Sequence, residues 1–127
     1  KGYILSGLIM MKNKSVWTPS YRLVIFVPEQ DMDAFMKAVS AHIPSFMGPY
    51  DHVAWWSEEG VEQFRALEGA QPAQGMVGQV ERDSCRRVEL SLPYDQDMLD
   101  RFVQAVILPS HPWEKPVIYI YNAQNLA

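Results

Sequence analysis

The feature that most constrains the fold is a strand followed by an amphipathic helix, a unit that occurs twice. In the first unit the run from Leu23 to Val27 is apolar throughout, as in a strand buried on both faces. Pro28 ends this strand, and apolar residues at helical spacing follow it: Met32, Phe35, Met36 and Val39. The second unit has an alternating strand, Cys85–Pro93, and then a helix with its own apolar stripe: Leu99, Phe102, Val103 and Val106.

The two units also resemble each other residue by residue. Asp33–Val39 and Asp100–Val106 agree in kind at five of seven positions, at a constant offset of 67, although the helical period itself accounts for part of the match. Asp95 is placed to cap the second helix, and Pro109 to end it. A duplicated unit predicts an α+β, ferredoxin-like βαββαβ sandwich whose antiparallel sheet has two helices on one face. The other face would be apolar in places, which invites a partner.

The middle and the end of the chain supply the remaining strands. We expect one strand to begin at Asp51, with Trp55 and Trp56 on opposite faces, one in the core and one at a subunit contact. Gln63–Gly69 is interpreted as a short returning strand, and Val117–Tyr121 as the last strand. Between them lies a loop whose glycines, Gly75 and Gly78, are expected to adopt backbone angles that other residues resist.

The length of 127 residues predicts one domain, which we place at residues 21–127. We interpret residues 1–20 as an N-terminal arm, non-native or able to pack on a partner, and not essential to the fold. Its apolar stretch Tyr3–Met11 is shorter than the ~20 residues that span a bilayer, so no membrane association is expected.

The charge of the chain limits its expected partners, and its cysteine content bears on its expected compartment. The formal net charge is −4 and the eleven Lys and Arg residues are scattered, so nucleic acid is not an expected partner. The single cysteine, Cys85, excludes an intrachain disulfide and fits a cytoplasmic protein. The sequence contains no Gly-rich phosphate loop, paired cysteines, HExxH or GxSxG, and we predict no catalytic residues.

The loop HPWEKP, His111–Pro116, contains the best candidate site residues. His111 and Glu114 are spaced to converge on a divalent metal or another ligand, but a metal requires three or four ligands. The alternative is a stiff turn between Pro112 and Pro116 in which both side chains bond to backbone. His52, which follows Gly48-Pro49-Tyr50, would join His111 if the two loops meet at one end of the sheet, or would otherwise be an ordinary strand residue.

Several motifs, in this order, resemble one known module: Gly48–Tyr50, Ser57 with Gly60, Phe64–Gly69, Pro72, Gly75, Gly78 and His111–Tyr121. It is the domain inserted in many bacterial members of the NGG-interacting-factor-three-like family (the YqfO type), and the resemblance covers about Tyr21 to Tyr121. It implies a fold similar to the CutA and PII signalling proteins and a homo-oligomer, with a trimer favoured over a dimer. It implies no established activity. The family's dimetal site belongs to flanking halves, so we expect a free-standing insert without that chemistry.

The chain departs from the module's pattern at three positions. Trp113 replaces tyrosine, Lys115 replaces the second acid of the loop, and Ala66 replaces proline. The missing carboxylate weakens the case for a hard-cation site in this loop.

The functional prediction is a small cytoplasmic binding or regulatory module that works as a homo-oligomer. The alternative is a divalent-metal or metabolite-binding protein that uses His111 and Glu114, with a metal as the one cofactor considered. A hydrolase with His111 as its base is a third and weaker hypothesis, because no nucleophile is evident; whether the chain is an enzyme stays open, with non-enzyme favoured. The candidate ligand-binding residues are Tyr50, His52, Arg65, Glu68, His111 and Glu114, although Arg65 and Glu68 are also placed to pair with each other across a turn.

Overall fold

The structure, a computed structural model, describes residues 17–46 and 48–126. Helical runs follow the first and the fourth strand of this part of the chain, and a 3₁₀ turn and a π-helical turn, η1 and η2, extend the helices. The elements are β1 (Trp17–Pro28), η1 (Glu29–Asp31), α2 (Met32–Ser40), β2 (Trp55–Trp56), β3 (Gly60–Arg65), β4 (Val80–Pro93), α3 (Gln96–Phe102), η2 (Val103–Ile107), α4 (Leu108–Ser110) and β5 (Ile118–Leu126).

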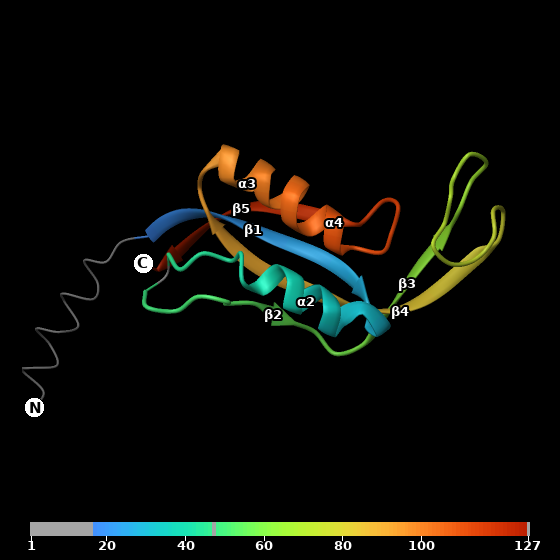
Figure 1. The fold of residues 1–127 in the computed structure, drawn as a ribbon, viewed down its shortest axis with the longest axis horizontal. Coiled ribbons are helices and arrows are strands. Elements are labelled where there is room, and N and C mark those ends of the chain that lie inside the picture. The colour runs from blue at the N-terminus through green and yellow to red at the C-terminus, as the bar shows by residue number, and fades with distance from the viewer. Residues whose placement is uncertain (1–16, 47, 127) are drawn as a thin grey trace, which may run out of the picture.

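The strands form one antiparallel sheet in the order β2-β4-β1-β5, and β3 pairs with the first half of β4. The helix α2 and the helical run α3–η2–α4 lie over the sheet on one side (Figure 1). Each helix follows a strand and returns the chain to a strand that is not its immediate neighbour. This arrangement is the ferredoxin-like sandwich, so the predicted α+β fold class is confirmed.

The core lies between the helices and the two central strands. Alternate residues of a strand face the same side, and in the β1–β4 register Leu23 pairs with Leu90 and Ile25 with Val88, all four fully buried. The helices add the buried side chains Phe35, Val39, Leu99, Phe102 and Ile107. The Oδ1 atom of Asp95 accepts a hydrogen bond from the Met98 N–H at 3.1 Å, which confirms the expected cap.

Two predicted boundaries are wrong. β1 begins at Trp17, paired with Leu126, and the fully buried Ser20 bonds Asn125 through Oγ–Oδ1 at 2.6 Å, so the domain begins before residue 21. The rest of the predicted arm, residues 1–16, lies outside the described residues. The second helical run ends at Ser110, one residue after Pro109, because Pro109 lies at the start of α4, where a missing N–H is tolerated.

The tryptophan pair also differs from expectation. Trp55 and Trp56 remain 48% and 47% exposed, so the prediction that one of them lies in the core is wrong. The physical reason is that β2 is only two residues long and lies at the edge of the sheet, so it has a neighbouring strand on one side only. The Trp55 ring instead lies under the guanidinium of Arg87, 5.4 Å from its carbon to the ring centroid.

The β3–β4 hairpin extends beyond the helices (Figure 1). Its strand β3 is centred a few residues before the predicted returning strand. Gly75 and Gly78 have φ angles of 81° and 87°, which confirms the expected glycine loop. No helix in the described part of the chain is long and apolar enough to cross a membrane.

Candidate functional site

The loop His111–Pro116 joins α4 to β5 at the end of the sheet where β1 finishes (Figure 1). His111 fixes this loop to the sheet, since its Nε2 atom lies 2.7 Å from the carbonyl oxygen of Phe26. The imidazole is only 8% exposed and meets the Phe35 ring edge-on, with 5.7 Å between centroids.

The partners of His111 define one protonation state. A carbonyl can only accept a hydrogen bond, so Nε2 carries the proton that it donates to Phe26. The other nitrogen, Nδ1, accepts a bond from the Trp113 backbone N–H at 3.1 Å and therefore has no proton. Burial lowers the pKa of His111 below its ordinary value, opposed by the Phe26 bond and by Asp31. The ring is a neutral Nε2–H tautomer at pH 7.

These bonds remove the chemistry that a metal or hydrolase site would require. Both ring nitrogens of His111 are engaged within the protein, so neither can bind a metal or act as a general base. Glu114 has a different partner: its Oε2 atom accepts a bond from the Gln71 N–H at 3.1 Å. Among residues 17–46 and 48–126, no three His, Cys, Asp or Glu side chains are grouped to hold a metal ion. The described geometry therefore gives no support to the predicted metal site or to a hydrolase that uses His111 as its base.

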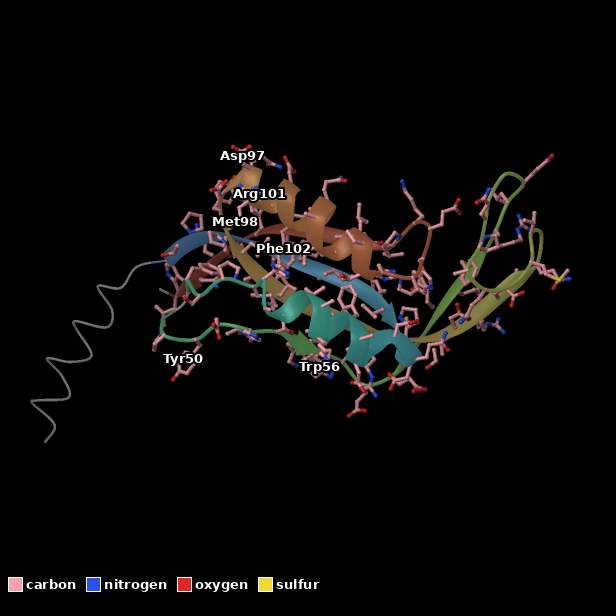
Figure 2. The ribbon with its side chains drawn as sticks, viewed as in Figure 1. Tyr50, Trp56, Asp97, Met98, Arg101 and Phe102 are labelled. Carbon is pink, nitrogen blue, oxygen red and sulfur yellow. The ribbon has the colours of Figure 1, made fainter. Side chains whose placement is uncertain are left out.

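The loops that contain His52 and His111 do not meet, so the alternative in which His52 joins His111 is wrong. Tyr50 lies at the end of the sheet opposite the His111–Pro116 loop (Figures 1 and 2) and is 68% exposed. His52 is exposed too, and its Nδ1 atom bonds the neighbouring Asp51 carboxylate at 3.0 Å. The two loops are separated because β1 and β4 are antiparallel, so the helices that follow them run in opposite directions. Each helix delivers its loop to a different end of the sheet.

The remaining candidate residues lie on the hairpin. Arg65 ends β3 and Glu68 follows in the turn, and both are exposed. The expected pair between them is absent from the four ion pairs found in the described residues. Glu114 is the one of the six candidates that lines the cavity described next, whereas His111 supports the loop from within.

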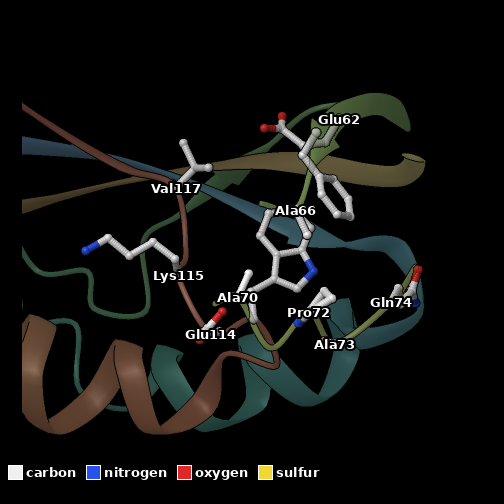
Figure 3. Close-up of a pocket in the computed structure, with 11 residues that line it drawn as sticks. Glu62, Ala66, Ala70, Pro72, Ala73, Gln74, Glu114, Lys115 and Val117 are labelled. Carbon is white, nitrogen blue, oxygen red and sulfur yellow. The ribbon is translucent and has the colours of Figure 1, made fainter. Parts of the chain in front are cut away.

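That cavity, of about 220 Å³, lies between the β3–β4 hairpin and the His111–Pro116 loop (Figure 3). Most of its wall is apolar, and charged side chains stand among the apolar ones. The lining residues are Glu62, Phe64, Ala66, Ala70, Pro72, Ala73, Gln74, Trp113, Glu114, Lys115 and Val117. Sequence reasoning missed Phe64 and Trp113 as site residues, although both belong to the two motifs that carried the resemblance.

Hydrogen bonds hold both walls of the cavity. The Glu114–Gln71 bond joins the loop to the hairpin across 43 residues of sequence. On the hairpin side the Gly78 N–H donates to the Ala66 carbonyl at 2.8 Å, which closes the turn. The cavity is therefore formed by segments that are tied to each other and, through His111, to the sheet.

The sheet face away from the helices has a mixed character. Trp55, Glu89, Val24 and Tyr119 stand in one row across four strands. Glu89 in this row forms ion pairs with two arginines: its Oε1 atom lies 3.1 Å from Arg22 Nε and its Oε2 atom 3.2 Å from Arg87 Nε. The expectation of a face that is apolar in places agrees with Val24, Trp55 and Tyr119, while the ion pairs of Glu89 make the centre of the face partly charged.

The topology defines a ferredoxin-like domain, and a small cavity lies between its β3–β4 hairpin and the His111–Pro116 loop. Comparison with known proteins then identifies relatives. A protein of Mycobacterium tuberculosis named GTP cyclohydrolase 1 type 2 homolog is 38% identical over 98 residues, which are 77% of this chain and 25% of the relative. The Bacillus subtilis protein of the same name is 28% identical over 127 residues, 96% of this chain and 33% of the relative.

A solved structure agrees with these relatives. The crystal structure of a Bacillus cereus protein related to NIF3 superposes with a TM-score of 0.67 at 25% identity, and the match covers 87% of this chain and 27% of that one. No family model matches the chain. The chain belongs to the NIF3-like family, and it spans about a quarter to a third of the length of these relatives.

Proposed function

We propose that this chain is a small cytoplasmic binding or regulatory module that works as a homo-oligomer, with a trimer favoured over a dimer. The observation that supports this most is the β5 strand, nine residues long, at the outer edge of the sheet. Its outer side has no partner strand among the described residues, and Tyr119, Ile120, Tyr121 and Leu126 are exposed along it. A long exposed apolar edge invites pairing with a second chain.

The sheet face next to β5 has the composition of an interface. Tyr121 is paired in register with Arg22, and Trp55 lies beyond Arg87 at the opposite edge. Aromatic side chains and arginine are enriched where protein surfaces meet. Glu89 already forms ion pairs with both arginines, Arg22 and Arg87. Burial of this face against another copy would therefore leave less unpaired charge than burial of the two arginines without Glu89.

Sedimentation velocity at micromolar concentration tests the assembly. The wild-type chain should sediment as a multiple of its mass of 14.6 kDa, with three copies favoured. Tyr121→Glu places a carboxylate at the proposed interface and should give monomers with an unchanged circular dichroism spectrum. Tyr50→Glu makes the same change at an exposed tyrosine in the loop before β2, the strand at the opposite edge of the sheet from β5, and should assemble like wild type. A monomeric wild type would contradict the proposal.

A further inference from the structure

We infer that the cavity between the His111–Pro116 loop and the β3–β4 hairpin binds an organic ammonium group on a short apolar stem. The inference does not depend on self-assembly, because all eleven lining residues come from one chain. The source of the group is either a free small amine or the side chain of a lysine in a peptide, and the chemistry recognised is the same.

The size of the cavity limits its occupant. A volume of about 220 Å³ lies below the roughly 300–1,000 Å³ of cavities that hold drug-sized ligands. An occupant is therefore a few carbon atoms and one polar group, or one inserted side chain. The apolar surface around this space disfavours a bare metal ion, which requires several oxygen or nitrogen ligands.

The wall suits an apolar stem and a cation. Phe64 and Trp113 contribute aromatic rings, and Pro72 and Val117 add aliphatic surface. The face of an aromatic ring is electron-rich and attracts ammonium groups, most strongly when water is partly excluded. Alkyl carbons next to the ammonium would contact the same rings, so one ligand satisfies both parts of the wall.

The charged side chains that line the cavity favour a cationic ligand over an anionic one. Glu62 on β3 and Glu114 on the loop bring two carboxylates to the cavity, against one ammonium from Lys115. Figure 3 shows the Lys115 side chain extending away from Pro72 and Ala73, whereas Glu114 lies beside Ala70. Neither Glu62 nor Lys115 takes part in an ion pair within the described residues. The site therefore favours a positively charged ligand.

The site is held in place before any ligand arrives. Glu114 uses Oε2 for the Gln71 N–H, and its other oxygen accepts no hydrogen bond from a described residue. His111 accepts the Trp113 N–H and so fixes the backbone that presents Trp113 and Glu114. Pre-ordering of this kind lowers the entropy lost on binding.

Calorimetry with a matched ligand series tests the inference on the whole chain. n-Butylammonium should bind, n-butanol should bind at least roughly tenfold more weakly, and butyrate should not bind, because one charge-assisted contact separates them. Nα-acetyl-lysine methylamide forms the second arm: tighter binding than n-butylammonium would assign the site to peptide lysines, and weaker binding would assign it to free amines. Equal affinity for butanol and butylammonium, tighter binding of butyrate, or no binding of either amine would overturn the inference.

A pair of charge-neutral variants locates the binding. Glu114→Gln keeps an oxygen for the Gln71 N–H but removes the charge, so butylammonium affinity should fall about tenfold. Glu68→Gln makes the same change on the same hairpin, outside the cavity lining, and should leave the affinity unchanged. Equal losses in the two variants would show a diffuse charge effect and would contradict the assigned site. Sedimentation of both variants as wild type would separate this result from the assembly proposal.

Discussion

The two proline-flanked loops look alike in sequence and differ in the structure. Gly48-Pro49-Tyr50-Asp51-His52 and the His111–Pro116 loop each combine proline, an aromatic, an acid and a histidine. In the first loop His52 is exposed and contacts only its neighbour Asp51 in the hydrogen bonds described. In the second, His111 is buried and bonds the strand β1 through Phe26, 85 residues away in sequence. One loop is an exposed connection, and the other is fixed to the fold and borders the cavity.

The difference shows that a loop histidine is defined by what its nitrogens meet. A carbonyl on one side and an amide on the other make His111 a structural group, while its neighbours Trp113 and Glu114 face the cavity. The residue with the most suggestive chemistry in the sequence is thus the one with no nitrogen available to a ligand. The residues beside it form the candidate site.

Replacing each of the two histidines with alanine should give the largest difference in the free energy of unfolding between the two loops. His111→Ala leaves the Phe26 carbonyl and the Trp113 N–H without their partner and opens a cavity beside Phe35. We expect the free energy of unfolding to fall by about 2–4 kcal/mol. His52→Ala should change it by less than about 0.5 kcal/mol, as at other exposed positions. Urea denaturation measures both, and similar losses in the two variants would remove the distinction between the loops.

The pH dependence of stability should come from His111. Burial lowers its pKa in the folded chain below the ordinary value of 6.5, so the unfolded chain binds the proton more readily. Its contribution is present above pH 6.5 and is lost as the pH falls below 6.5 through the lowered pKa. The urea midpoint should therefore drop between pH 7.5 and 5.5.

Two controls isolate this titration. Arg86 lowers the pKa of Glu29 below its ordinary 4.5, so the contribution of Glu29 is lost only at more acid pH. His52→Gln should retain the drop between pH 7.5 and 5.5, and His111→Gln should abolish it. A drop that persists in His111→Gln would assign the effect to another group.

Glycine at residue 52 should give the smallest effect. His52 has a φ angle of 59°, a left-handed conformation that costs side-chain-bearing residues more than glycine. His52→Gly should therefore raise the free energy of unfolding slightly, by less than about 1 kcal/mol, despite the lost exposed pair with Asp51. Thermal unfolding detects such a change. A loss of more than about 1 kcal/mol would mean that the His52 side chain stabilises the loop and that the two loops are less different than described.

The sequence predicted the parts of this molecule that follow from local patterns. The apolar stripe with Phe35 and Val39, the Asp95 cap and the two strand–helix units depend on residues close in the chain, and all are found. The opposite placement of His52 and His111 could also have been predicted from the expected topology, because helices after antiparallel strands run in opposite directions, but the expectation that their loops could meet overlooked it. The directions of the two helices are therefore enough to place these histidines at opposite ends of the sheet.

Other features depend on contacts that local patterns do not encode. The exposure of Trp55 and Trp56 depends on the position of β2 at the edge of the sheet, which strand pairing decides. The cavity depends on the hairpin and the loop meeting through the Glu114–Gln71 bond, 43 residues apart. Trp113 could therefore be recognised as part of a motif, while its place in a cavity wall required the fold.

The most direct test is the tautomer of His111, measured from its ring ¹⁵N chemical shifts by NMR at pH 7.5. We expect a protonated Nε2 and a bare Nδ1 in one pure form, assigned by loss of those signals in His111→Gln. A ring that exchanges between both tautomers, or one that is protonated at Nδ1, would contradict this expectation, because His111 would then not be held between Phe26 and Trp113 and the cavity wall would lose its anchor.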